Sequence, residues 1–228
     1  MTVSPAHFRA QMTRLARWGY VGLSLQQALI GLSDGARQGQ RVVALTFDDG
    51  YRDFQEQAWP ILRQLGFGAT LFVVADRVGG RADWAGGSSA LLLDWDALGW
   101  LAEAGVEIGA HGLDHRPLDQ LSAPGLTRSL ADQQSILLHR LGQAPCGLAY
   151  PYGRWSTAAA AAARQAGFSY AATTRGGKND ERTPLFKLRR TLVRPASGQR
   201  LALLRFALLV RSGYADIIDW LMDLRRIP

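Results

Sequence analysis

Short apolar runs alternate along the chain with segments whose apolar residues recur at helical spacing. The first pattern is typical of buried strands, and the second is typical of amphipathic helices. We expect strands at 19–23, 41–47, 69–75, 106–110, 146–150, 168–173 and 186–193. Helices are expected between them, at 4–18, 24–32, 53–65, 94–104, 122–141 and 156–166.

Capping residues mark several of the expected helix starts. Asp53 and Glu56 have the spacing of a capping box, in which two side chains satisfy free backbone N–H groups at the start of a helix. Asp94 and Ser122 stand immediately before two further amphipathic segments, and Gly142 follows the second of them. These residues set the expected helix boundaries.

The alternation of strands and helices predicts the fold class. Apolar strands separated by helices favour a parallel sheet covered by helices. With about seven such strands, we expect an α/β fold, and a distorted (β/α) barrel in preference to an open doubly wound sheet. The chain has 228 residues, which is short for a complete eightfold barrel of about 250 residues. The tail 199–228 is interpreted as two helices broken at Ser212 and Gly213, a helical C-terminal extension.

The chain is basic, with a net charge of +7 and a pI of about 10.2, and its arginines are concentrated from Arg175 onward. Because these residues do not alternate with aromatics and no nucleic-acid motif is present, the sequence argues against a nucleic-acid partner. An anionic lipid, a phosphate-bearing substrate or an acidic polymer fits the charge equally well. Peripheral membrane contact through the basic C-terminal region is therefore an alternative to its packing on the barrel.

Residues 1–19 carry three arginines and lack the apolar segment of a signal peptide. We therefore expect a cytoplasmic location, with the inner face of the membrane as the alternative. The single cysteine, Cys146, excludes an internal disulfide and a cysteine-rich zinc site. The sequence leaves the oligomeric state open.

Polar side chains that can bind a metal follow two of the expected strands. Asp48 and Asp49 end the run 42–50, and His111 and His115 end the run 106–115. Taken alone, Asp-Asp-Gly is most simply a capped turn, and the histidines could be solvated or satisfied in the core. However, residues just beyond the carboxyl ends of parallel strands line the active sites of α/β folds.

The histidine pair lies four residues apart, a spacing that places both imidazoles on one face of a helical turn. Asp114, between them, could orient one imidazole or could be an exposed cap. Two imidazoles and one carboxylate form the donor set of hydrolytic zinc sites, with open positions for water and substrate. Asp48, beside such a metal, could accept a proton from water. The same donors accept cobalt or nickel.

Three segments together resemble a known family. Thr-Phe-Asp-Asp-Gly at 46–50, His-Gly-Leu-Asp-His at 111–115 and Tyr-Pro-Tyr-Gly at 150–153 are similar, in order and spacing, to the first three motifs of the polysaccharide deacetylases, carbohydrate esterase family four. The resemblance spans roughly residues 40–195. It implies a distorted (β/α) barrel and the metal-dependent removal of N-acetyl groups from amino sugars.

The resemblance also implies a domain organisation. Residues 1–40 would form a helix–strand–helix unit that packs on the barrel, and residues 41–195 would form the catalytic deacetylase barrel. Residues 196–228 would be C-terminal helices of the same domain.

The resemblance further implies a role for individual residues. Asp49, His111 and His115 would bind the metal, usually zinc, and Asp48 would be the general base. The backbone N–H of Tyr152 would hold the oxyanion of the tetrahedral intermediate. We expect further substrate contacts from the carbohydrate-binding candidates Tyr150, Pro151 and Trp155. Of the tryptophans Trp84, Trp95 and Trp155, the last is the favoured stacking residue because it lies just past the third motif.

The chain departs from the family pattern at two places. Many members have an arginine two residues before the proline of the third motif, in contact with the base, and this chain has Ala149 there. The resulting Tyr-Pro-Tyr-Gly form resembles members closer to the poly-N-acetylglucosamine deacetylases. The late histidine that protonates the leaving amine has no counterpart, because no histidine follows His139. The general acid is therefore unassigned.

Asp48 could return the proton itself, acting first as base and then as acid. Arg189, Arg190 or Arg194 could stabilise charge near the site. The sequence thus predicts a metal-dependent hydrolase that removes N-acetyl groups from amino sugars of a poly- or oligosaccharide. The alternatives are a deacylase or deformylase of a lipid-linked sugar, and a non-catalytic carbohydrate-binding homologue.

Overall fold

A computed structural model of the chain describes residues 3–33, 39–84, 90–180, 182–193 and 217–220. Eight strands form one sheet, in the order β8-β7-β6-β3-β2-β10-β9, with β1 also paired to β2. The strands are β1 Tyr20–Leu23, β2 Arg41–Phe47, β3 Thr70–Val73, β6 Glu107–Ala110, β7 Gly147–Ala149, β8 Tyr170–Ala172, β9 Thr191–Val193 and β10 Ile217–Trp220. All of these pairings are parallel, as the alternation of strands and helices predicts.

The sheet curls until its two ends meet. A parallel bridge joins Ala172 of β8 to Leu188, three residues before β9. The backbone N–H of Leu188 donates to the carbonyl of Ala171, and the N–H of Thr173 donates to the carbonyl of Leu188. This connection between β8 and the segment leading to β9 confirms the expected distorted barrel.

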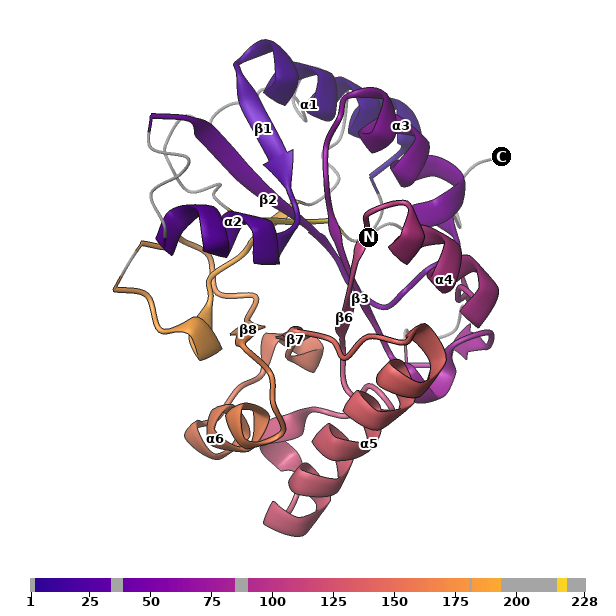
Figure 1. Ribbon diagram of the computed structural model, residues 1–228, viewed down its shortest axis with the longest axis vertical. Helices are drawn as coiled ribbons and strands as arrows, with labels where there is room; N and C mark the ends of the chain where they lie inside the picture. The colour runs from indigo at the N-terminus through magenta and orange to yellow at the C-terminus, as the bar shows by residue number, and fades with distance from the viewer. Residues whose placement is uncertain (1–2, 34–38, 85–89, 181, 194–216, 221–228) are drawn as a thin grey trace.

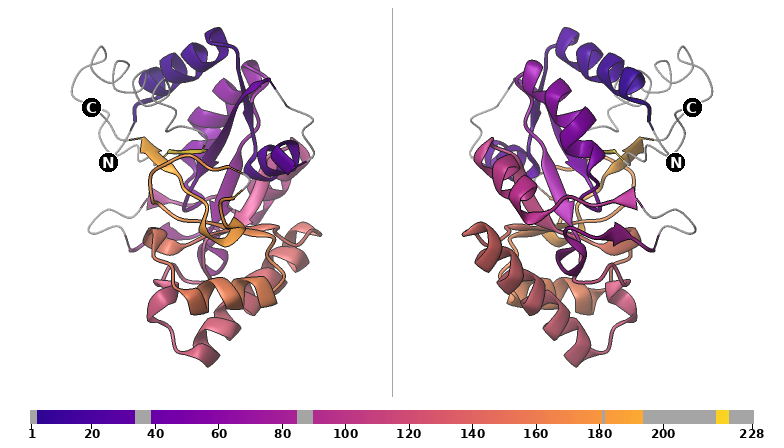
Figure 2. Two further views of the ribbon diagram at one scale, coloured as in Figure 1. Left: turned by 90° about the vertical axis from the view of Figure 1, so that its left-hand side faces the viewer. Right: turned by 90° about the vertical axis from the view of Figure 1, so that its right-hand side faces the viewer.

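Helices cover the outside of the curled sheet (Figures 1 and 2). They are α1 Pro5–Arg17, α2 Leu25–Ser33, α3 Trp59–Gln64, α4 Trp95–Glu103, α5 Ala123–Leu141 and α6 Thr157–Gln165. A small antiparallel pair, β4 Arg81–Ala82 and β5 Ala90–Leu91, lies in the expected surface excursion between β3 and α4. Within the described residues, no helix has both the length and the apolarity that a membrane span requires.

Two of the three expected N-caps are confirmed. The side chains of Asp94 and Ser122 accept hydrogen bonds from the backbone N–H groups three residues later. The expected cap at Asp53 is wrong, since its side chain makes no capping hydrogen bond. Its backbone is already helical, with φ −63° and ψ −19°, and a single π-helical turn, Phe54–Ala58, precedes α3. An N-cap side chain needs an extended backbone to reach the N–H groups that follow it.

The C-terminal expectation needs correction at residues 217–220. These residues form strand β10, between β2 and β9, and not part of a helix. Ile217 and Ile218 are β-branched, and β-branched residues favour strands over helices. The strand forms here because β2 and β9 offer backbone groups on both sides. The remainder of the tail from residue 196 onward lies outside the described residues.

The expected strand 186–193 is shorter in the structure. Leu185–Lys187 forms a 3₁₀ turn, closed by a hydrogen bond from the N–H of Lys187 to the carbonyl of Pro184, and the strand β9 begins only at Thr191. Phe186 has φ −90° and ψ 17°, so the backbone leaves the extended conformation inside the expected strand.

Two glycines make room for aromatic rings inside the barrel. A Cβ at Gly109 would lie 2.4 Å from the ring of Phe72, and a Cβ at Gly147 would lie 2.2 Å from the ring of Tyr170. Phe72 and Tyr170 are fully buried in one apolar cluster with small residues such as Ala149. Close packing of large against small side chains therefore fills the barrel.

Candidate metal and catalytic site

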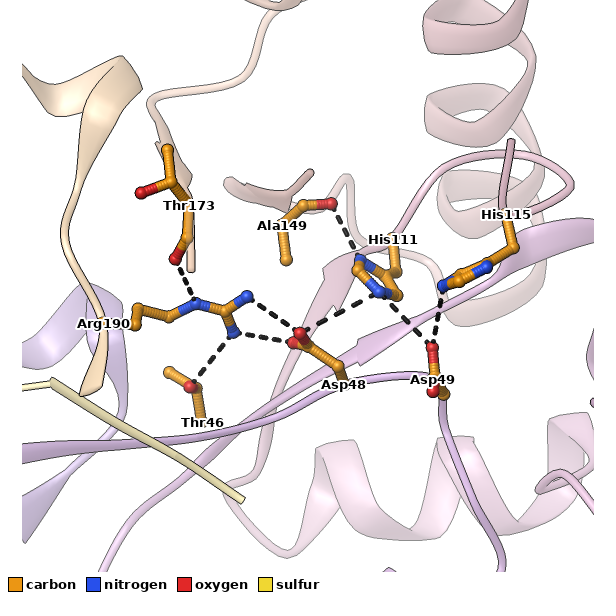
Figure 3. A network of polar contacts seen from close by, with 8 residues as sticks. All are labelled: Thr46, Asp48, Asp49, His111, His115, Ala149, Thr173 and Arg190. Atoms are coloured by element: carbon orange, nitrogen blue, oxygen red, sulfur yellow. Dashed lines mark hydrogen bonds and ion pairs between the residues drawn. The ribbon is translucent and has the colours of Figure 1, made fainter. Parts of the chain in front are cut away.

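Four buried polar side chains meet at the carboxyl ends of β2 and β6 (Figure 3). Asp48 and Asp49 directly follow β2, and His111 directly follows β6. The N–H of His111 donates to the carbonyl of Val73 at the end of β3, so three neighbouring strands fix this edge. The sequence prediction that these strand ends converge is confirmed.

The backbone at the site is strained. Among the described residues, only Asp49, His115 and Tyr152 combine a side chain with a positive φ, of 74°, 63° and 59° respectively. Such left-handed conformations cost about 1–3 kcal/mol each for a residue other than glycine, and they cluster at functional sites. All three residues belong to the sequence-predicted site.

The two histidines approach each other through a bent loop, not through the helical turn that their spacing suggested. Residues 111–116 contain no helix, and Gly112 has a φ of 81°. The carbonyls of Gly112 and Leu113 accept hydrogen bonds from the N–H groups of Ala75 and Asp76. The loop is thus anchored beyond the end of β3, and the two imidazole centroids lie 5.0 Å apart.

Asp49, His111 and His115 offer three ligand atoms that lie within 4.8 Å of one another. Oδ1 of Asp49 is 3.1 Å from Nε2 of His115 and 3.4 Å from Nε2 of His111. Nδ1 of His111 donates to the carbonyl of Ala149 over 2.8 Å, which leaves Nε2 facing the other two ligands. A buried set of two imidazoles and one carboxylate fits a divalent transition metal.

A backbone carbonyl, and not Asp114, orients the ligand imidazole. The side chain of Asp114 bonds instead to the backbone N–H and the guanidinium of Arg116 at the surface. Asp114 is half-buried and closes a turn with Arg116 in a loop without a helix, so its contacts support neither the orienting role nor the exposed cap.

The ionisation of the site follows from burial and from its own charges. Burial lowers the pKa of His115, which favours the neutral imidazole that a metal requires. Burial acts to raise the pKa of Asp49, but hydrogen bonds from the two imidazoles lower it below its usual range. Burial acts to lower the pKa of His111, but the facing charges of Asp48 and Asp49 raise it. The negative charges of Asp48 and Asp49 therefore favour the binding of a cation at this site.

Arg190 supplies one positive charge. Its side chain is fully buried, and its Nη1 and Nη2 donate to Oδ1 and Oδ2 of Asp48 over 2.7 and 2.8 Å. Nε donates to the carbonyl of Thr173, and Nη1 also contacts Oγ1 of Thr46. Burial alone would raise the pKa of Asp48, but the Arg190 guanidinium holds it below its usual value. Asp48 is therefore an ionised carboxylate, with Oδ2 3.9 Å from Nε2 of His111.

Arg190 occupies the role that the sequence left vacant. The family pattern has an arginine at the position of Ala149, whereas here the guanidinium comes from the segment before β9. Of the three arginines considered from the sequence, Arg189 is exposed and Arg194 lies outside the described residues.

The third motif lies beneath and beside the histidines. Tyr150 is fully buried, and its hydroxyl donates to the carbonyl of Phe186 over 3.0 Å. Pro151 is buried against Gly112, whose Cβ would lie 3.0 Å from the proline ring. Tyr152 is 52% exposed, and its ring meets the ring of His115 edge-on, with centroids 4.6 Å apart. The substrate contacts of Tyr150 and Pro151 and the oxyanion role of the Tyr152 backbone N–H stay predictions.

Two tryptophans differ in their relation to the site. Trp155 is half-buried against the core, and the Lys187 ammonium lies 4.1 Å from its ring centroid. Trp84 stacks on the imidazole of His115, with centroids 4.4 Å apart and an interplanar angle of 20°. The sequence favours Trp155 because it lies just past the third motif, a position that Trp84 does not share. The structure brings Trp84 to the site more directly than Trp155, whose groove role stays a prediction.

Relatives of the chain were found by sequence. The sequence model of the polysaccharide deacetylase family matches residues 35–171. The candidate polysaccharide deacetylase YxkH of Bacillus subtilis is 27% identical over 195 residues, which cover 86% of this chain and 67% of that protein. A chitin deacetylase of Pestalotiopsis is 30% identical over 127 residues, which cover 56% of this chain and 39% of that protein.

Solved structures have the same fold. The Streptococcus pyogenes deacetylase PplD, solved in complex with acetate, has a TM-score of 0.77 and 26% identity, covering 90% of this chain and 87% of that chain. IcaB from Ammonifex degensii has a TM-score of 0.74 and 24% identity, covering 88% of each chain, a likeness of fold. Since the family match spans more than half of the chain and contains the whole buried cluster, this chain belongs to the polysaccharide deacetylase family.

Proposed function

We propose that the chain is a metal-dependent hydrolase that removes N-acetyl groups from amino sugars of a poly- or oligosaccharide. The observation that carries the proposal is the pairing of Asp48 with Arg190 beside the cluster of Asp49, His111 and His115. A protein that only bound sugar would have no use for a carboxylate held ionised at that place. The family and the curated relatives support the same reaction class.

Asp49, His111 and His115 would hold the metal, and zinc is the proposed ion, although cobalt or nickel suits the same donors. When bound, a divalent cation would act as a Lewis acid that polarises the amide carbonyl and makes water more acidic. All three side chains are buried, so few solvent molecules would compete with these ligands for the metal.

Asp48 would accept a proton from the water oxygen that attacks the carbonyl carbon. The backbone N–H of Tyr152 would donate to the oxyanion of the tetrahedral intermediate. Asp48 would then give the proton to the amide nitrogen as the C–N bond breaks, releasing acetate and a free amine. The lowered pKa of Asp48 favours this second step, because a protonated carboxyl next to Arg190 gives up its proton readily.

The test is acetate release from an acetylated chito-oligosaccharide by protein reconstituted with zinc. Asp48→Asn should keep its metal and lose turnover by about 10²–10⁴-fold, the usual contribution of a general base. His111→Ala should lose the metal itself, as measured by elemental analysis after dialysis. If both variants released acetate at the wild-type rate, the roles assigned to these residues would be wrong.

A further inference from the structure

A pocket of about 310 Å³ lies in the segment between β8 and β9. Five cationic side chains and one threonine line it: Arg175, Lys178, Arg182, Lys187, Arg189 and Thr183. Four of the cations are exposed, and Lys187 is half-buried over Trp155. The pocket therefore combines a concave shape with a strong positive charge.

The cations of the pocket form no salt bridge among the described residues, although the charge of Arg182 acts on the carboxylate of Asp180. None of the five lies within salt-bridge distance of a described carboxylate. Elsewhere among the described residues, arginines do pair with aspartates, as at Arg77, Arg116, Arg154 and Arg190. The one carboxylate in the pocket wall, Asp180, is engaged by the loop: it accepts from the hydroxyl of Thr183 and from the backbone N–H of Arg182. With five cations against this one carboxylate, the described wall of the pocket keeps a net positive charge that an anionic ligand could neutralise.

The loop that carries these cations is held in a fixed shape. The side-chain amide of Asn179 donates to the carbonyl of Arg189 over 2.8 Å and accepts from its N–H over 2.9 Å. Gly177, with a φ of 136°, lies against the Arg189 side chain, where a Cβ would be 2.9 Å from Cδ. These contacts fix the backbone around Arg189, which reduces the conformational entropy that the loop would lose on binding an anion.

The pocket lies next to the turn of the third motif, residues 150–153. Thr174, next to Arg175, packs on Gly153 of the third motif, where a Cβ would lie 2.0 Å from its hydroxyl oxygen. The carbonyl of Arg175 accepts from the N–H of Arg190, the residue that holds Asp48. Lys187 covers the ring of Trp155, two residues beyond Gly153. A sugar bound at the cluster could therefore extend a substituent into the pocket.

We propose that this pocket binds a phosphate group carried by the carbohydrate substrate, which makes the substrate a phosphorylated amino sugar or its polymer. The proposal rests on the proposed deacetylase function. Guanidinium forks and ammonium groups are the donors that recognise phosphate oxygens. The hydroxyl of Thr183 already donates to Asp180, so the cations alone would bind the phosphate. A phosphate carries about −1.5 to −2 charges at neutral pH, so it neutralises the positive charge of this pocket better than a single carboxylate does.

Calorimetric titration of zinc-loaded protein with N-acetylglucosamine 6-phosphate and with N-acetylglucosamine tests the proposal. We expect the phosphorylated sugar to bind at least about tenfold more tightly, a difference of about 1.4 kcal/mol. In Lys178→Glu/Arg182→Glu this preference should disappear. The matched control is Arg63→Glu/Arg128→Glu, which makes the same change of charge at two exposed arginines outside the pocket and should retain the preference.

Two further titrations separate other sources of anion binding. Equal affinity for inorganic phosphate and the sugar phosphate would show a free-anion site and overturn the link to substrate. Tighter binding of N-acetylmuramic acid than of the sugar phosphate would overturn the assignment to phosphate. Equal loss of preference in the pocket and control variants would show that only overall charge matters. Acetate release from the unmodified oligosaccharide, measured in parallel, tests the deacetylase function separately.

Discussion

Arg190 holds both carboxylate oxygens of Asp48, over 2.7 and 2.8 Å, although the two residues are 142 positions apart in the chain. Both side chains are buried, and the planar guanidinium matches the carboxylate in a bidentate pair. The pair fixes the orientation of the proposed base and keeps it ionised. We therefore expect Arg190 to be a positioning residue that acts through Asp48.

Removing Arg190 should impair both turnover and folding. We expect Arg190→Ala to lower kcat by about 10²-fold, the scale of losing one preorganised electrostatic contact in an active site. It should also lower the free energy of unfolding by about 3–5 kcal/mol, because Asp48 would be left as a buried unpaired charge. Steady-state kinetics and urea unfolding measure the two effects. Arg128→Ala, at an exposed arginine of α5, is the matched control.

Arg190→Lys separates charge from geometry. Lysine keeps the positive charge but cannot form the two parallel hydrogen bonds. We expect it to recover most of the lost stability and only part of the lost kcat. Full recovery of kcat by lysine would contradict a role for the bidentate geometry.

Moving the arginine should rescue activity in part. Ala149 and Arg190 both approach Phe72 inside the barrel. Truncating Arg190 leaves room there, so Ala149→Arg in the Arg190→Ala background should place a guanidinium near Asp48. We expect kcat to rise at least about tenfold above that of Arg190→Ala, as roughly 1.4 kcal/mol of barrier is recovered. A double variant that folds but is no more active than Arg190→Ala would contradict the exchange of positions.

Trp84 should support the metal-binding geometry. Because its indole stacks on the His115 ring, Trp84→Ala would free that imidazole to rotate. We expect the affinity for zinc to fall about tenfold, at the lower end of what neighbours of a metal ligand contribute. Competition with a chromogenic chelator measures the affinity. Trp100→Ala, at a tryptophan of α4 that is 45% exposed, should leave it unchanged.

The stability of the fold should fall in alkaline solution because of Tyr170. Burial raises the pKa of Tyr170 well above 10, and the Glu107 carboxylate that accepts its hydrogen bond raises it further. The folded chain therefore keeps this proton where the unfolded chain releases it. The stabilisation is complete below pH 10 and is lost above it, at up to about 1.4 kcal/mol per pH unit.

Urea unfolding between pH 8 and pH 11 checks this. Tyr170→Phe should be less stable than the wild type at pH 8, because Glu107 loses a donor, but its stability should decline less steeply above pH 10. Tyr20→Phe, at a half-buried tyrosine of β1, controls for the loss of one hydroxyl. Parallel slopes for the wild type and Tyr170→Phe would rule out Tyr170 as the source.

The left-handed backbone at Tyr152 should cost stability. Its φ is 59° and its ring is 52% exposed, so glycine would relieve strain and remove little packing. We expect Tyr152→Gly to unfold with a free energy about 1 kcal/mol higher than that of Tyr152→Ala, which keeps the strain. Both variants lose the ring, so any difference in kcat between them reports on the backbone alone. Equal stability of the two would argue against strain at this position.

The sequence predicts the positions of Asp48, Asp49 and His111 because each directly follows an apolar run that becomes a strand. The sequence also predicts that the imidazoles of His111 and His115 lie close together, but their spacing suggests a helical turn. In the structure, residues with a positive φ bend the loop instead. Local pattern could not single out Arg190, since its partner comes from the other end of the barrel sequence.

The C-terminal misassignment has a similar cause. The apolar residues Ile217, Ile218, Leu221 and Leu224 have a spacing that suits a helix face. What makes 217–220 a strand is the space between β2 and β9, a property of the assembled sheet that no short window of sequence contains.

The glycines inside the barrel constrain how this chain can evolve. Gly109 leaves the volume that Phe72 fills, and Gly147 leaves the volume that Tyr170 fills. The sizes of the two residues in each pair therefore constrain each other. A methyl group at either glycine is tolerable only after the ring opposite has become smaller, and the reverse order leaves a void. Relatives should therefore show these two pairs of positions changing size together.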